Sequence, residues 1–182
     1  MSISPGTHTL GPANGTLAVS TERSGAAAKA GHNLLIHVTD WQATLEVGDD
    51  SALTSIALDA DGKSLRVQEG TGGMQALGED DKESIVQTID EDVLKRQAIG
   101  FRSTTVHTAP GGSPISVEGE LTLVGETHPV ALELSVAPDG AITGSTVLKQ
   151  TDWRIKPYSA LFGALKVVDE VTVTIDATLP RT

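Results

Sequence analysis

Residues 31–47 read GHNLLIHVTDWQATLEV and form the longest stretch of the chain that is typical of a β-strand. Its apolar side chains occupy even positions in the first half and odd positions in the second half. A strand points alternate side chains to opposite faces, so one apolar face follows both sets only if a residue is inserted. We therefore predict one long strand with a β-bulge near Thr39-Asp40. The residues expected on its inner face are Leu34, Ile36, Val38, Trp41, Ala43, Leu45 and Val47.

Other segments show the same alternation of apolar and polar side chains. The pattern is clearest in ISVEGELTL (115–123), VALELSV (130–136) and VTVTIDA (171–177). Short Gly-, Pro- and Asp-rich separators predict tight connections between most of these strands. The predicted strands are 16–20, 53–60, 64–68, 98–108, 115–124, 130–137, 141–151 and 168–178, after a polar lead-in over residues 1–14.

Two glycine-containing sites interrupt the first half of the chain. Asp61-Gly62 separates two apolar runs and predicts a hairpin that pairs 53–60 with 64–68. Gly70-Thr71-Gly72-Gly73 lacks the third glycine of a dinucleotide fingerprint, because Gln75 stands there, and no βαβ pattern surrounds it. We interpret this second site as a loop.

One segment, residues 80–95 (DDKESIVQTIDEDVLK), is typical of an amphipathic helix. Ile85, Ile89 and Val93 recur four residues apart and lie on one helical face. The acidic run 90–92 could break this helix near its end. A helix of this length is expected to cover one face or end of the sheet.

These elements predict one all-β domain over residues 1–182, with the sheet spanning about 6–179. Short connections between successive strands favour an eight-stranded antiparallel β-barrel with one amphipathic helix, and a β-sandwich is the alternative. The chain has two Trp, one Tyr and two Phe, so the inward side chains are mainly aliphatic or small. Such walls predict a hollow axis that binds an elongated apolar molecule, with about 0.8 kcal/mol gained per buried methylene.

Composition excludes several classes of function. The chain has no cysteine, which excludes disulfides and thiolate chemistry, and its 13 basic and 24 acidic side chains give a net charge of −11. This acidity without a basic cluster argues against nucleic-acid binding. The start of the chain lacks the features of a secretory signal, and no segment has the length of an apolar membrane span. We therefore expect a soluble, cytoplasmic protein.

The sequence predicts neither a catalytic nor a metal site. The five histidines lack HxH or HExxH spacing, and no GxSxG motif is present. His32 and Asn33 are expected at a polar rim of the barrel, and 156–164 forms either a lid or a plug. The predicted ligand-binding residues are Leu34, Ile36, Val38, Trp41, Ala43, Leu45, Ile56, Leu58, Phe101, Ser103, Leu121, Leu132, Trp153 and Phe162.

Several motifs resemble those of the YceI-like family of lipocalin-like, polyisoprenoid-binding proteins. The most specific is G-E-L-T-L-V-G-E-T-H-P-V at Gly119–Val130, accompanied by Phe101-Arg102-Ser103 and by Thr151-Asp152-Trp153. The resemblance covers about residues 6–179. It implies an extended lipocalin-like barrel that encloses a long amphiphile such as a polyprenyl quinone or a fatty amide, with no shared catalytic residue and no required cofactor.

We therefore expect a non-enzymatic protein that holds a polyisoprenoid or other long-chain lipid for transport, storage or sequestration. The expected partner is this hydrophobic small molecule, and a homodimer is compatible with the sequence. Two alternatives stay open: a small enzyme that uses His32 or Ser103 on a bound lipid, and a packed barrel with a structural or interaction role.

Overall fold

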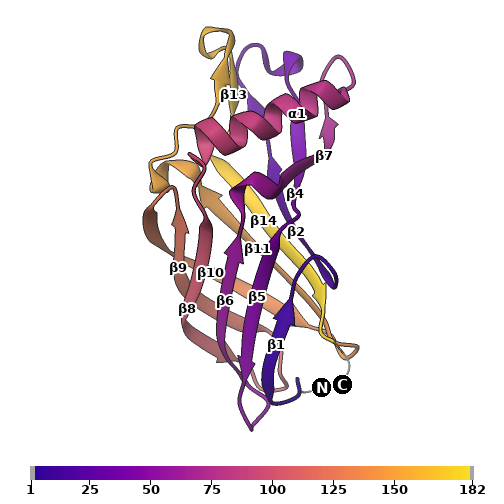
Figure 1. Ribbon diagram of the computed structural model, residues 1–182, viewed down its shortest axis with the longest axis vertical. Helices are drawn as coiled ribbons and strands as arrows, with labels where there is room; N and C mark the ends of the chain where they lie inside the picture. The colour runs from indigo at the N-terminus through magenta and orange to yellow at the C-terminus, as the bar shows by residue number, and fades with distance from the viewer. Residues whose placement is uncertain (1–2, 181–182) are drawn as a thin grey trace.

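The computed structural model describes residues 3–180, and most of this chain forms one antiparallel sheet that curls strongly into a half-barrel (Figure 1). The sheet has 11 strands in the order β1-β5-β6-β8-β9-β10-β11-β14-β2-β4-β7. Three short strands, β12, β13 and β3, form a second sheet at one end. The strands are β1 (Gly6–Leu10), β2 (Gly15–Thr21), β3 (Arg23–Ser24), β4 (Asn33–Val38), β5 (Trp41–Val47), β6 (Leu53–Ala60), β7 (Leu65–Thr71), β8 (Ile99–Thr108), β9 (Ile115–Leu123), β10 (Glu126–Val136), β11 (Ala141–Lys149), β12 (Ser159–Ala160), β13 (Leu165–Val167) and β14 (Glu170–Thr178).

Residues 31–47, whose alternation changes phase, form two strands, β4 and β5, that meet at a corner. β4 pairs with β2 and β7, whereas β5 pairs with β1 and β6. At the corner, Thr39 N–H donates to Ser64 O and Asp61 N–H donates to Asp40 O, both at 3.0 Å. The connection from β4 to β5 and the connection from β6 to β7 therefore lie side by side and turn together. The predicted bulge in a single strand is wrong, although the change of phase is real.

The predicted hairpin at Asp61-Gly62 is also wrong. β6 and β7 do not pair with each other, because the residues between them form a 3-10 turn, Gly62–Ser64. The Asp61 carboxylate accepts the Lys63 N–H at 2.8 Å and stabilises this turn. The true reversal joins β5 to β6, where Gly48 N–H donates to Ala52 O.

The predicted amphipathic helix is confirmed as a ten-residue helix, α1 (Glu79–Thr88), followed by a five-residue π-helical turn, Ile89–Val93. The helix crosses the end of the half-barrel near β13 (Figure 1), and Ile85, Ile89 and Val93 pack against the core. The π-turn coincides with the acidic run where a break was expected. Within residues 3–180, no helix is both long and apolar enough to cross a bilayer.

The predicted antiparallel, mostly β class with one helix is thus confirmed. The main sheet has 11 strands, more than the eight predicted, for two reasons. The corner at Thr39-Asp40 divides the predicted long strand 31–47 into β4 and β5, whereas β6 and β7 correspond to the two strands predicted at 53–60 and 64–68. The predicted lead-in contains β1, which joins the edge of the sheet beside β5. β1 was not predicted because its sequence, GTHTL, has one large apolar residue.

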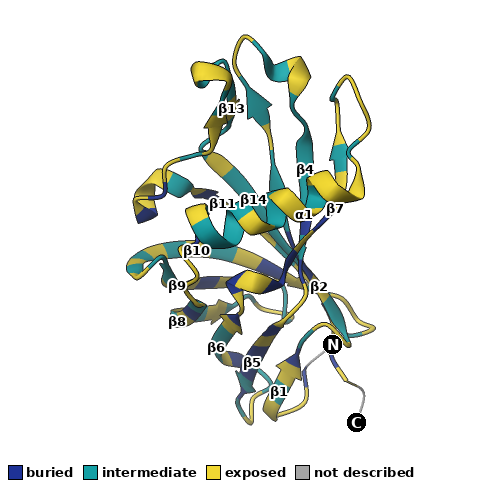
Figure 2. Ribbon diagram, turned by 45° about the horizontal axis from the view of Figure 1, so that its top comes forward, coloured by how far each residue is buried: buried dark blue, intermediate teal, exposed yellow. Residues whose placement is uncertain are grey.

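Burial is uneven along the half-barrel. Figure 2 shows that buried residues are frequent on β5 and β9, whereas β13 and the covering helix α1 consist of intermediate and exposed residues. The large side chains with less than 2% of their surface exposed are Leu10, Leu45, Ile115, Ile142 and Val117. One end is therefore closely packed, and the end beneath α1 is more open.

Candidate ligand-binding site

The curled sheet and α1 enclose an apolar cavity of about 550 Å³. This volume lies within the range of about 300–1,000 Å³ found for small-molecule sites. The helix contributes Ile85 and Ile89 to the wall, and the strands contribute the rest of the aliphatic surface. The cavity is bounded at its packed end by Leu10, Leu45 and Ile142, which are almost fully buried.

All the aliphatic residues predicted to bind a ligand, and Phe101, line this cavity. Their positions follow from strand alternation, which points every second side chain to the concave face. Both halves of the phase-changing stretch contribute, because the corner turns each apolar set inward. The predicted residues that line the cavity are Leu34, Ile36, Val38, Ala43, Leu45, Ile56, Leu58, Phe101, Leu121 and Leu132. Their contact with a ligand stays a prediction.

Two predicted aromatic residues lie away from the cavity. Trp41 begins β5 at the corner and is only 3% exposed; it packs in the core cluster and does not line the cavity. Phe162 lies in a short 3-10 turn, Leu161–Gly163, and its side chain is fully exposed. The loop 156–164 still reaches the cavity through Tyr158, which lines it and is half exposed. Phe162 does not close over the opening.

Trp153 supports the cavity wall from behind. Its indole Nε1–H donates to Leu121 O at 2.9 Å, and its ring meets His128 edge-on with a centroid separation of 5.6 Å. It is 2% exposed and packs with Leu148 and Ile155, both of which line the cavity. Trp153 therefore supports the strands of the wall, and the Thr151-Asp152-Trp153 motif does not line the cavity.

Ser103 has a backbone role. Its Oγ accepts the Ile56 N–H at 2.9 Å, just beyond the point where the β6–β8 ladder ends at Ala57 and Arg102. Ser103 pairs with Gly119 in the β8–β9 ladder, and the register shifts immediately after it, leaving Thr104 without a partner in the ladder. This hydroxyl does not line the cavity. The alternative of Ser103 as a reactive group therefore lacks geometric support.

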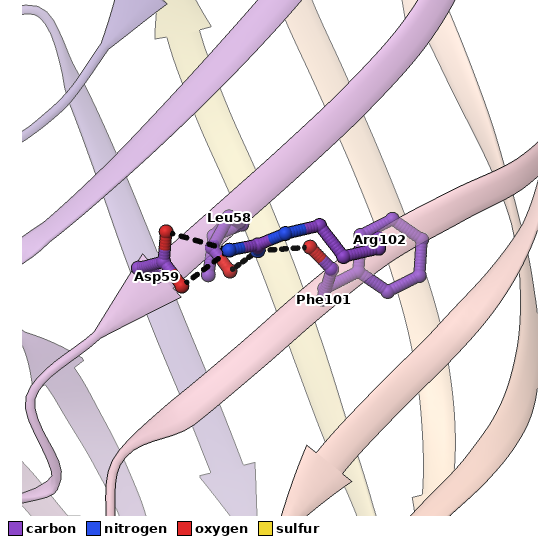
Figure 3. A network of polar contacts seen from close by, with 4 residues as sticks. All are labelled: Leu58, Asp59, Phe101 and Arg102. Atoms are coloured by element: carbon purple, nitrogen blue, oxygen red, sulfur yellow. Dashed lines mark hydrogen bonds and ion pairs between the residues drawn. The ribbon is translucent and has the colours of Figure 1, made fainter.

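Phe101 and Arg102 act on opposite faces of β8. Phe101 is the Cα partner of Leu58 across the β6–β8 ladder, and both side chains line the cavity. On the other face, Arg102 donates to both carboxylate oxygens of Asp59, at 2.9 and 3.1 Å, and to the carbonyls of Leu58 and Phe101 (Figure 3). Arg102 therefore links β8 to β6 on the outer face of the sheet, and these two strands carry the wall residues Phe101 and Leu58.

The two most specific motifs meet at Gly119. A Cβ built on Gly119 would lie 2.5 Å from Phe101 Cζ and 2.5 Å from Arg102 O. The absence of a side chain therefore lets the Phe101 ring lie against β9. At the far end of the same motif, Val124 and Gly125 have positive φ values, 52° and 72°, which form the tight turn from β9 to β10.

The opening beneath α1 carries polar side chains, including His32 and one residue that the sequence did not single out, Arg23. His32 Nε2–H donates to Gln75 O at 2.6 Å. Asn33 does not line the cavity; its Oδ1 accepts the Arg23 N–H at 3.0 Å and thereby positions β3. Arg23 was missed because it stands in a small-residue segment, ERSGAAAKAG, without periodicity or motif.

Asp169 anchors the chain next to Trp153. Burial alone would raise the pKa of Asp169, but its hydrogen bonds from the Thr151 hydroxyl (2.6 Å) and the Thr151 N–H (2.9 Å) outweigh that effect. With the charge of Lys149 and the Gln150 N–H, they hold the pKa of this carboxyl below its usual value. Within residues 3–180, no group of three or more His, Asp or Glu side chains could hold a metal ion.

A profile described as a YceI-like domain matches residues 13–179, nearly the whole chain. The chain belongs to the YceI-like family. Its predicted family resemblance is thus confirmed. Comparison with curated proteins finds no match to this YceI-like chain.

Solved structures show the same fold. The structure of Burkholderia cenocepacia BcnA matches with a TM-score of 0.65 at 17% sequence identity, covering 94% of this chain and 98% of BcnA. The Campylobacter jejuni YCEI protein matches with a TM-score of 0.61 at 11% identity, covering 81% of this chain and 85% of its own. At such identities the similarity establishes the YceI-like fold alone.

Proposed function

We propose that this YceI-like protein is a non-enzymatic binding protein that holds a long-chain amphiphile in its cavity. The observation that carries the proposal is the apolar cavity of about 550 Å³, whose wall is built from the inner faces of the sheet and closed over by α1. Membership of a family known for lipid- and polyisoprenoid-binding proteins supports it. The ligand would be a polyisoprenoid such as a polyprenyl quinone, or a fatty amide, held for transport, storage or sequestration in the cytoplasm.

The proposed architecture is a closed, lipocalin-like barrel. β4 with β5 and β6 with β7 are each counted as one bent strand, because both turn the same corner. The ring then runs β2, β4–β5, β6–β7, β8, β9, β10, β11 and β14, and each member is hydrogen-bonded to the next. β1 lies outside this count. An eight-stranded barrel of this kind is wide enough for one small ligand.

Aliphatic burial would supply the affinity. At about 0.8 kcal/mol per methylene, a chain of a dozen carbons gains on the order of 10 kcal/mol before the costs of ordering are subtracted. Polar groups near the opening would then orient the head of the ligand. The packed-barrel alternative is disfavoured, because it would leave no cavity of this size.

The deciding experiment is native mass spectrometry of protein mixed with a polyprenyl quinone or a fatty amide, using two tryptophan variants. Leu45→Trp fills the cavity from its wall, whereas Gln42→Trp lies on the opposite, exposed face of the same strand. We expect one bound amphiphile in the wild type and in Gln42→Trp, and none in Leu45→Trp. Uptake by a folded Leu45→Trp protein, or none by the wild type, would contradict the proposal.

A further inference from the structure

The charged side chains that line the cavity have one sign. Arg23 and Lys166 line it together with the titratable side chains His32 and Tyr158, and within residues 3–180 no Asp or Glu is part of the lining. This contrasts with the whole chain, in which 24 acidic residues outnumber 13 basic ones. The cavity lining is therefore positively charged, although the chain as a whole is acidic.

Arg23 is held in place by neutral acceptors. Its Nη1 donates to Thr71 O at 3.1 Å and to Asn33 Oδ1 at 3.4 Å, and its Nη2 donates to Gly72 O at 2.5 Å. Among the described residues, no carboxylate pairs with it, and its Nε is buried without a hydrogen-bond partner. The guanidinium therefore has an unneutralised charge and an unused donor.

The Gly-rich loop after β7 makes this arrangement sterically possible. A Cβ on Gly72 would lie 2.1 Å from Arg23 Nη1, and one on Gly73 would lie 2.3 Å from His32 Nε2. Gly72 also has a φ of +79°, a conformation that side chains disfavour. The two glycines let the guanidinium and the imidazole lie directly against the loop backbone.

β13 brings a second cation to the same opening. Its Val167 is the Cα partner of Arg23, and Lys166 is the partner of Ser24 on the other strand of this small sheet. Lys166 is exposed and lines the cavity, so it adds positive potential at the outer margin.

We propose that this opening selects an amphiphile with a carboxylate head, that is, a long-chain fatty acid anion, and that Arg23 binds the head. A guanidinium matches a carboxylate with two parallel N–H donors, and such charge-assisted hydrogen bonds are stronger than neutral ones. The partnerless Nε and the second Nη2 hydrogen supply such a pair. The inference rests on the proposed function, since it assumes that the acyl chain occupies the cavity.

The test compares palmitate with palmitamide, which share one acyl chain and differ in head charge. Dissociation constants are measured at pH 8 by displacement of a neutral, polarity-sensitive dye. We expect the wild type to bind palmitate at least about tenfold more tightly than palmitamide, as hydrogen bonds to charged groups commonly provide. Arg23→Gln should reduce this preference to within about twofold.

Two further variants make the result specific. Arg154→Gln removes an exposed arginine that does not line the cavity, and should keep the wild-type preference. Arg23→Lys keeps the charge but loses the paired donors, and should give an intermediate preference. Equal wild-type affinities, or a preference that persists in Arg23→Gln or is unaltered in Arg23→Lys, would overturn the inference while leaving the proposed function intact. Failure of both ligands to bind would overturn the inference, and it would overturn the proposed function as well if a polyprenyl quinone also fails to bind.

Discussion

Ser103 shows how a single side chain can complete a sheet. Its Oγ accepts the Ile56 N–H where the β6–β8 ladder ends, so the half-buried amide is not left without a partner. Ser103→Ala removes the acceptor, and an unsatisfied buried donor costs about 1–3 kcal/mol. We expect the free energy of unfolding, measured in urea, to fall by about this amount.

The control for Ser103→Ala is Ser135→Ala, an exposed position on β10. It should change the free energy of unfolding by less than about 0.5 kcal/mol. Equal stability of the two variants would show that Ser103 has no special backbone role.

Thr151 and Asp169 couple stability to pH. The pKa of Asp169 is lower in the folded protein than its ordinary value of about 3.9, because hydrogen bonds from Thr151 outweigh the effect of burial. A depressed carboxyl pKa stabilises the fold above the ordinary pKa, and this contribution disappears as pH falls through the folded value. Thr151→Val removes the hydroxyl and should raise the pKa of Asp169, as measured by NMR titration.

The same variant should change how the free energy of unfolding depends on pH in the acidic range. Relative to the wild type, Thr151→Val should be less stable above pH about 4, and the difference should shrink below it as Asp169 is protonated in both proteins. Thr143→Val, exposed on β11, serves as the control. A difference between wild type and Thr151→Val that grows toward low pH would have the wrong sign for this account.

Among the elements, the corner between β4 and β5 shows what a sequence pattern can and cannot specify. The apolar phase change at Thr39-Asp40 was readable, because alternation records which face each side chain takes. A bulge and a corner produce the same change of phase. They differ in which strands pair on either side, and pairing depends on residues far away in the chain, such as Ser64. The same limit explains the error at Asp61-Gly62.

Gly119 allows β8 and β9 to pack closely because it has no side chain. Gly119→Ala would place a Cβ within 2.5 Å of the Phe101 ring and of Arg102 O, so the ring or β9 must move. Overpacking of this kind typically costs about 1–3 kcal/mol. We expect Gly119→Ala to lower the free energy of unfolding by that amount and to shift the Phe101 ring resonances.

Gly100→Ala is the matched control for this element. It lies next to Phe101 on β8, and a Cβ there would meet only Asp59 Oδ1, at an ordinary contact distance of 3.7 Å. Gly100→Ala should keep or slightly raise stability. A cost for Gly100→Ala as large as that for Gly119→Ala would indicate a general requirement for glycine in these strands.

For the whole molecule, the predictable part of the cavity is its aliphatic wall. Alternation identified residues such as Leu34, Leu58 and Leu132, because burial in a curled sheet follows strand periodicity. The aromatic assignments were less accurate, since a large side chain such as Trp153 can stabilise a wall from either side. Arg23 was not predictable, because its position depends on the tertiary approach of β3 to the loop after β7.

Occupancy of the cavity should also appear in thermal unfolding. A ligand that binds only the folded state at 100 times its dissociation constant adds about 2.7 kcal/mol of stability. For a protein of this size we expect Tm to rise by about 5–11 °C with the amphiphile that binds best. Leu45→Trp should show no such rise, and Gln42→Trp should show all of it. An unchanged wild-type Tm at saturating amphiphile would argue against binding.

β1 stands at the end of the strand order and covers an edge of the sheet that another chain could otherwise pair with. It pairs along the outer edge of β5, whose sequence WQATLEV combines high β-propensity with alternate buried positions. Deletion of residues 1–10 would bare that edge, and an uncovered edge is a template for pairing with another chain. The truncated protein should scatter light and bind thioflavin T on warming, whereas Thr7→Ala, which loses only a side-chain bond to Glu46, should stay monodisperse. We therefore expect the five-residue strand β1 to prevent fibril growth by covering the edge of β5.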